Sequence, residues 1–116
     1  MKYLVSGGGT GGHIYPALAI INEIKSNVKD AKFLYVGTEN GLEARIVPRE
    51  GIDFKTIRVK GMPRRLNKQS FIALKELLHG LKESKKIIRN FKPDIVIGTG
   101  GFVCGPVVYQ GSRSKI

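Results

Sequence analysis

The stretch Ser6-Gly7-Gly8-Gly9-Thr10-Gly11-Gly12-His13 decides the fold of this chain. It follows a short apolar segment, Tyr3-Leu4-Val5, and precedes a helical pattern that opens at Pro16. Glycine lets the backbone approach a ligand closely, and the N-terminus of a helix points unpaired N–H groups at it. A strand, a glycine loop and a helix in this order are therefore typical of a phosphate-binding site.

The chain repeats this glycine pattern once. Residues 98–106, Gly-Thr-Gly-Gly-Phe-Val-Cys-Gly-Pro, echo residues 9–16 with one inserted residue. One such loop is a weak signal. Two loops, each between an apolar strand and a proline-led helix, indicate a site with two anion-binding walls.

Hydrophobic periodicity predicts alternating strands and helices. We expect strands over residues 2–6, 32–37, 54–59 and 94–98, and helices over 14–27, 41–47, 70–90 and from Pro106 onward. This alternation predicts a parallel α/β sheet with right-handed crossovers. In the doubly wound order the first and fourth strands are neighbours. The two glycine loops would then face each other across one crevice at the carboxyl edge of the sheet.

The bulk properties describe one domain of 116 residues with 41% hydrophobic residues. The single cysteine, Cys104, excludes an internal disulfide framework and suits a reducing compartment. No apolar run approaches the roughly 20 residues of a spanning helix. We expect a cytosolic protein that can touch a membrane from that side.

The positive charge is concentrated in one segment. Residues 54–92 hold twelve Lys or Arg and two acidic residues, which makes +10 of the net +11. Such a block attracts nucleic acid, anionic lipid or a phosphorylated substrate, unless it is only a solvated basic face. Few aromatic residues accompany it, and the segment resembles no nucleic-acid-binding module, so we expect no nucleic acid partner.

The helix expected over 70–90 carries both a cationic and an apolar pattern. Lys68, Lys75, Lys82 and Arg89 recur every seven residues, and Lys85 and Lys86 widen that side. The predicted core stripe is Phe71, Leu74, Leu78, Leu81 and Ile88, with a surplus, such as Ile72 or Leu77, that faces outward. Two interpretations remain open: a helix that rests on an anionic leaflet, or an ordinary amphipathic helix that covers the sheet.

The polar residues of the loops leave several roles open. His13 can act as a general base, cap its helix, or bind phosphate as a cation. His79 is interpreted as structural or interfacial, and Cys104 as a small loop residue rather than a nucleophile. Gly7, Gly9 and Gly12 also fit G-x-G-x-x-G with Glu39 after the second strand, as in a dinucleotide-binding oxidoreductase, although the second loop has no role in that pattern. No spacing suggests a metal site.

Several motifs together resemble the MurG family of N-acetylglucosaminyltransferases. They are Gly8-Gly9-Thr10-Gly11-Gly12-His13, Pro16-Ala17-Leu18-Ala19, Gly37-Thr38, Gly41-Leu42-Glu43, and Lys92-Pro93-Asp94 through to Pro106. The resemblance covers essentially the whole chain. It implies the N-terminal, acceptor-binding half of a GT-B fold over residues 1–116, with a Rossmann-like parallel sheet, and no bound metal or cofactor.

The resemblance also implies a reaction and its partners. The family transfers GlcNAc from UDP-GlcNAc to the MurNAc C4 hydroxyl of lipid I, an undecaprenyl diphosphate, and gives lipid II for peptidoglycan. The enzyme works as a peripheral protein at the anionic cytoplasmic face of the cell membrane.

The family's roles carry over onto matching residues of this sequence. Thr10, Gly11 and Gly12 match the residues that contact UDP-GlcNAc, and His13 matches the family's candidate base or acceptor binder. Contacts to the acceptor diphosphate are implied for Gly100, Gly101, Phe102, Val103, Cys104 and Gly105. The implied membrane patch consists of Arg64, Arg65, Lys68, Phe71, Ile72, Lys75, Lys82, Lys86 and Arg89.

The sequence departs from the family pattern in three respects. Phe102 replaces a common tyrosine and Cys104 a common serine, so we expect the hydroxyl hydrogen bonds to be lost and backbone N–H contacts to remain. The chain also stops at Ile116, before a second domain. We expect a fragment or one subunit of a split transferase, without transferase activity by itself; a membrane- or partner-docking module is a further alternative.

Overall fold

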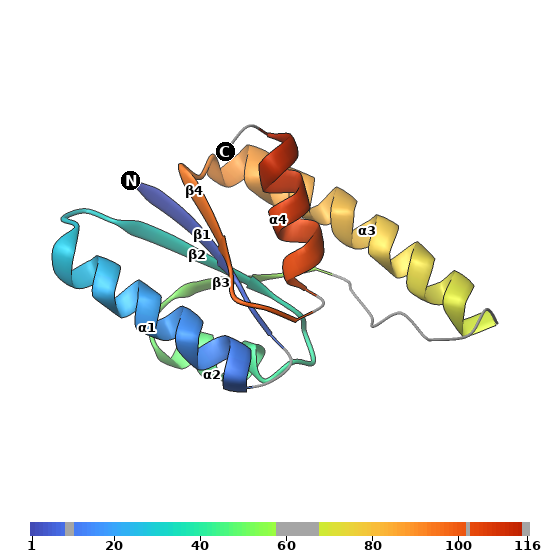
Figure 1. The fold of residues 1–116 in the computed structure, drawn as a ribbon, viewed down its shortest axis with the longest axis horizontal. Helices are drawn as coiled ribbons and strands as arrows, with labels where there is room; N and C mark the ends of the chain where they lie inside the picture. Colours follow the sequence, from blue (N-terminus) through green and yellow to red (C-terminus); the bar gives the residue numbers. More distant parts are fainter. Residues whose placement is uncertain (9–10, 58–67, 102, 115–116) are drawn as a thin grey trace.

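The computed structural model describes residues 1–8, 11–57, 68–101 and 103–114. Four strands alternate with four helices in this part of the chain (Figure 1). Their bounds are β1 Lys2–Ser6, α1 Gly11–Asn27, β2 Lys32–Gly37, α2 Glu43–Arg49, β3 Asp53–Thr56, α3 Lys68–Phe91, β4 Ile95–Gly98 and α4 Cys104–Arg113. The α/β class predicted from the sequence is confirmed.

The sheet is parallel and has the order β3-β2-β1-β4. Leu4 of β1 is paired with Leu34 of β2 on one side and with Val96 of β4 on the other. The predicted adjacency of the first and fourth strands is therefore confirmed, and the chain reverses its winding direction between them. Ligands of open α/β sheets bind at this point.

Helices cover both faces of the sheet, which explains why consecutive residues inside the central strands are apolar, Tyr3–Val5 in β1 and Phe33–Val36 in β2. Tyr3 and Val5 of β1 point into one core cluster with Ile14 and Ile21 of α1. Leu4 points the other way, into a cluster with residues of α3 and α4. Figure 1 shows α1 and α2 on one side of the sheet and α3 and α4 on the other.

Helix and strand ends differ from the prediction. Helix α1 begins at Gly11 rather than at residue 14, and α4 begins at Cys104 rather than at Pro106. Pro106 is the third residue of α4 and fits within its first turn, where backbone N–H groups lack intrahelical partners, whereas Pro16 is the sixth residue of α1 and lies inside that helix. Helix α2 likewise continues through Pro48 to Arg49. Strand β3 ends at Thr56; residues 58 and 59 of the predicted strand lie outside the described part.

The predicted core stripe of α3 is wrong at Leu74 and Leu78, which are 46% and 59% exposed. The stripe is confirmed at Ile88, which is buried near the end of α3 together with Ile87. The 24 residues of α3 span about 36 Å, whereas strands of four to six residues span about 13–20 Å. The first half of α3 therefore projects beyond the sheet, as Figure 1 shows.

Candidate functional site

The two glycine loops lie against each other at the carboxyl edge of β1 and β4. The N–H of Gly8 donates to the carbonyl of Gly100 at 3.2 Å, and the N–H of Thr99 donates to the carbonyl of Ser6 at 2.9 Å. The loops continue the β1–β4 pairing, in which Ser6 is the partner of Gly98. The two loops are thus neighbours and touch directly through their backbones, while an anion-binding crevice formed by them stays a prediction.

Glycine is required where the loops touch. Gly101 has φ +93°, and a Cβ there would overlap the carbonyl oxygen of Gly8. A Cβ on Gly7 would overlap Oγ1 of Thr99. These glycines serve loop-to-loop contact, in addition to any approach to a ligand.

Side chains hold the carbonyl groups of the first loop toward the protein. The hydroxyl of Tyr35 donates to the carbonyl of Gly7, and Nδ1 of His13 lies 3.0 Å from the carbonyl oxygen of Gly8. The carbonyl of Ser6 accepts from Sγ of Cys104 at 2.9 Å. These carbonyl oxygens already accept hydrogen bonds from inside the protein. The N–H groups in the first turn of α1 lack intrahelical partners, so that turn gives this end of the loop its positive electrostatic potential.

His13 joins both loops. Its carbonyl accepts from Oγ1 of Thr99 at 2.6 Å, and its half-buried ring packs beside Gly100, where a Cβ would lie 3.0 Å from Nε2. A carbonyl oxygen can only accept a hydrogen bond, so Nδ1 carries the hydrogen. In the neutral ring the lone pair is therefore on Nε2.

Cys104 makes hydrogen bonds that the sequence did not lead us to expect. Its buried thiol donates to the carbonyl of Ser6 and accepts from the N–H of Gly100 at 3.2 Å. Both bonds lie within the protein, so the expected loss of a serine hydroxyl's contacts to a ligand stays a prediction. The thiol ties the start of α4 to both β1 and the second loop.

Tyr35 and Glu43 lie under the first loop and were missed by sequence reasoning. Burial, and then the charge of Glu43, raise the pKa of Tyr35 well above its usual range, so its hydroxyl remains a donor to Gly7. Glu43 is fully buried on the first turn of α2. The only available signal was Glu43 itself, a carboxylate in the glycine-flanked segment Gly37–Glu43 that precedes and opens a short helix.

The remaining site residues divide by location. Gly11 is half-buried and Gly12 is exposed at the start of α1; Gly105 is exposed and faces open space. Val103 is 2% exposed and belongs to a core cluster, so only its backbone is available to a ligand. Thr10, Phe102, Arg64 and Arg65, and the side chains of Lys68, Phe71 and Ile72, lie outside the described part.

The described half of the basic helix is exposed. Lys75, Lys82, Lys86 and Arg89 of α3 are exposed, as is His79, and they accompany the exposed Leu74 and Leu78. Within the described residues no helix is long and apolar enough to cross a membrane. Over the same residues no cluster of three His, Cys, Asp or Glu side chains is placed to hold a metal ion.

Comparisons with known proteins show which family the chain resembles. Two relatives are named UDP-N-acetylglucosamine--N-acetylmuramyl-(pentapeptide) pyrophosphoryl-undecaprenol N-acetylglucosamine transferase. The one from Finegoldia magna is 62% identical over 115 residues, which cover 99% of this chain and 31% of that protein. The one from Listeria monocytogenes is 57% identical over 116 residues, or 100% of this chain and 32% of that protein. The chain thus spans about a third of the length of these relatives.

A solved structure has the same fold. The crystal structure of Acinetobacter baumannii MurG matches 99% of this chain with a TM-score of 0.83 and 25% sequence identity, and the match covers 33% of that chain. Residues 3–116 also match the glycosyltransferase family 28 N-terminal domain. The chain therefore belongs to glycosyltransferase family 28, of which it carries the N-terminal domain.

Proposed function

We propose that this chain is the acceptor-binding domain of an inverting N-acetylglucosaminyltransferase of the MurG type. The enzyme would move GlcNAc from UDP-GlcNAc to the C4 hydroxyl of MurNAc on undecaprenyl diphosphate. The contact between the two glycine loops supports this most directly. In the first loop, the carbonyl oxygens of Gly7 and Gly8 already accept hydrogen bonds from Tyr35 and His13. Such a wall suits two diphosphates, one on the donor and one on the lipid.

The proposed roles follow the two loops. Thr10, Gly11 and Gly12 contact UDP-GlcNAc in this proposal, and Gly11 and Gly12 open α1, where N–H groups and the helix dipole favour an anion. Gly100, Gly101 and the backbone of residues 102–105 contact the lipid diphosphate. The N–H groups of the first loop stabilise the negative charge that develops on UDP as it leaves.

His13 is the proposed base of the transfer. Because Nδ1 is held by Gly8, Nε2 is free of its hydrogen and accepts the proton of the C4 hydroxyl. The C4 oxygen attacks C1 of GlcNAc on the face opposite UDP, the bond from C1 to UDP breaks, and the configuration at C1 inverts.

A second part of the proposal concerns location. The cationic and apolar face of α3, formed by Lys75, Lys82, Lys86 and Arg89 with Leu74 and Leu78, would rest on the anionic cytoplasmic leaflet. This contact would bring the crevice to its lipid-linked acceptor. The enzyme would then be peripheral to the membrane.

The transfer of labelled GlcNAc to a lipid-linked MurNAc acceptor tests the reaction, with the chain in its native polypeptide. We expect His13→Ala to lower kcat by about 10²- to 10⁴-fold, the usual contribution of a positioned acid or base. His79→Ala is the matched control, since His79 is exposed on α3. Full activity of His13→Ala would exclude His13 as the general base. Absence of transfer by the unmodified protein would exclude the proposed GlcNAc transfer.

A further inference from the structure

Three glycines from separate segments surround the side chain of Glu43. Gly8 follows β1, Gly37 ends β2, and Gly41 precedes α2. A Cβ on Gly8 would overlap Oε2 of Glu43, a Cβ on Gly41 would overlap Oε1, and a Cβ on Gly37 would overlap Cγ. A Cβ at any of these three positions would therefore require the Glu43 side chain to shift.

The Glu43 carboxylate lies directly behind the first glycine loop. It is fully buried, so it does not reach the crevice itself. Its neighbour Tyr35 donates to the carbonyl of Gly7, the residue before Gly8, and the Tyr35 ring stacks with Phe54 at 6.1 Å between centroids. Glu43 and Tyr35 thus support two consecutive loop residues from the same side.

The burial of a carboxylate carries a free-energy cost that the burial of an apolar side chain does not. Removal of the charge from water costs several kcal/mol before compensation, whereas an apolar side chain of similar volume has no such cost. A carboxylate differs from an apolar side chain in one useful property: both of its oxygens accept hydrogen bonds and neither donates.

We propose that Glu43 is a positioning residue that sets the conformation in which the first glycine loop binds the donor diphosphate. It touches no substrate and acts through Gly8 and the start of the loop. This inference rests on the proposed function, because it takes UDP-GlcNAc as the ligand of that loop.

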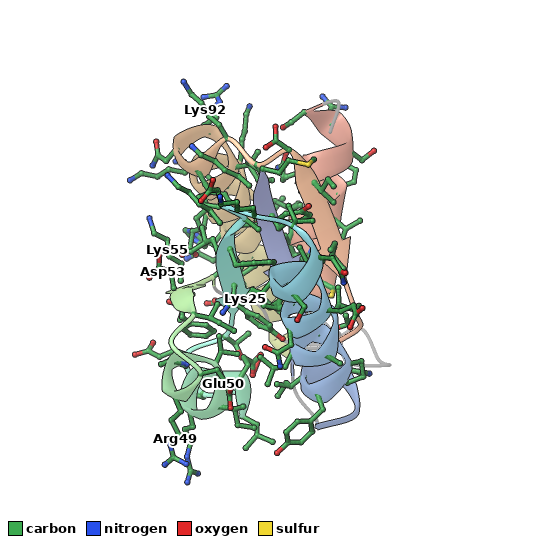
Figure 2. The ribbon with its side chains drawn as sticks, turned by 90° about the vertical axis from the view of Figure 1, so that its left-hand side faces the viewer. Lys25, Arg49, Glu50, Asp53, Lys55 and Lys92 are labelled. Carbon is green, nitrogen blue, oxygen red and sulfur yellow. The ribbon has the colours of Figure 1, made fainter. Side chains whose placement is uncertain are left out.

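The first test separates the charge of Glu43 from its volume. Glu43→Gln keeps the volume and removes the charge; Glu50→Gln is the matched control, since Glu50 is exposed at the end of the same helix (Figure 2). We expect Glu43→Gln to weaken UDP-GlcNAc binding by about tenfold to a hundredfold in calorimetric titration, as a loop displaced by about an ångström would. We expect Glu50→Gln to bind as the unmodified protein does. Unchanged affinity in a folded Glu43→Gln variant overturns the inference.

The second test uses the overlap between Gly8 and Glu43, and it stands if Glu43→Gln fails to fold. Gly8→Ala should lower the melting temperature, and the same change in a Glu43→Ala background should cost much less, because the overlapping oxygen is gone. Binding of UDP-GlcNAc should stay weak in the double variant. If the double variant recovered both its melting temperature and its affinity for UDP-GlcNAc, the Glu43 side chain would serve only to pack, and the inference would be overturned. An unmodified protein that binds no UDP-GlcNAc would instead overturn the proposed function.

Discussion

At the scale of single residues, the glycines of the second loop have different reasons to be glycine. Gly101 has a positive φ and touches the carbonyl of Gly8, whereas a Cβ on Gly105 would meet nothing within 4 Å. The sequence shows both only as glycine-rich loop residues. The distinction depends on contacts between segments about 90 residues apart in the chain, which no local pattern encodes.

Substitution of these two glycines tests the loop contact. We expect Gly101→Ala to lower the free energy of unfolding by about 1–3 kcal/mol, because it combines a strained φ with an overlap on Gly8. Gly105→Ala should stay within about 0.5 kcal/mol of the unmodified protein. Urea unfolding monitored by circular dichroism measures both. Equal effects of the two substitutions would contradict the described contact.

Tyr35 gives a second prediction at this scale, on pH. Its pKa is raised in the folded protein, so the unfolded chain loses this proton first, above its ordinary value of 10.0. The contribution of Tyr35 is therefore complete below pH 10 and declines as pH rises above it, since the unfolded state then binds fewer protons. Tyr35→Phe should lack this decline, although it loses about 1 kcal/mol with the hydrogen bond to Gly7.

The comparison of urea unfolding at pH 9 and pH 11 checks this prediction. The free energy of unfolding should fall more between these two values in the unmodified protein than in Tyr35→Phe. Tyr109→Phe is the control, because Tyr109 is exposed on α4. An identical pH dependence in all three proteins would contradict the claim that the raised pKa of Tyr35 causes this loss of stability.

At the scale of elements, periodicity predicted which segments are strands and helices but not all their ends or faces. Strands β1 and β2 have the predicted bounds because they are buried apolar runs with glycine or polar residues at their ends. The stripe of α3 was predicted wrongly because the heptad pattern does not show where the sheet beneath it ends. Leu74 and Leu78 extend beyond that edge and remain exposed.

The exposed face of α3 yields a prediction about membranes. Lys75→Glu, Lys82→Glu and Lys86→Glu together should abolish binding to vesicles that contain anionic lipid, since each cation near such a surface contributes about 1 kcal/mol. The matched control changes Lys25, Lys29 and Arg49 to Glu. It alters the net charge equally, and its residues are exposed on or next to α1 and α2, across the sheet from α3 (Figures 1 and 2).

Vesicle co-sedimentation measures both triple variants. The control should retain most of the binding, because its charges lie away from the apolar Leu74 and Leu78. Equal loss in the two variants would show that net charge alone drives the association. Unchanged binding of the α3 variant would contradict the membrane proposal.

At the scale of the whole molecule, the strand order is what makes two remote loops into one structure. Adjacency of β1 and β4 was predictable from the alternation of elements, and it brings Gly8 and His13 beside Thr99 and Gly100. The contacts of Tyr35 and Glu43 with the first loop were not predictable from the sequence. These side chains reach the loop from β2 and α2, which are separate segments of the chain. The sequence therefore predicted that the two loops are neighbours, and the structure adds which side chains of β2 and α2 hold the first loop.

The backbone amide spectrum of the protein, recorded by NMR with UDP-GlcNAc and separately with NAD, tests the central claim that both loops form one anion-binding crevice. We predict that UDP-GlcNAc shifts amide signals in both segments, 7–13 and 98–105, and that NAD at the same concentration shifts neither. Shifts confined to one segment, or a response to NAD in the first loop, would contradict the claim.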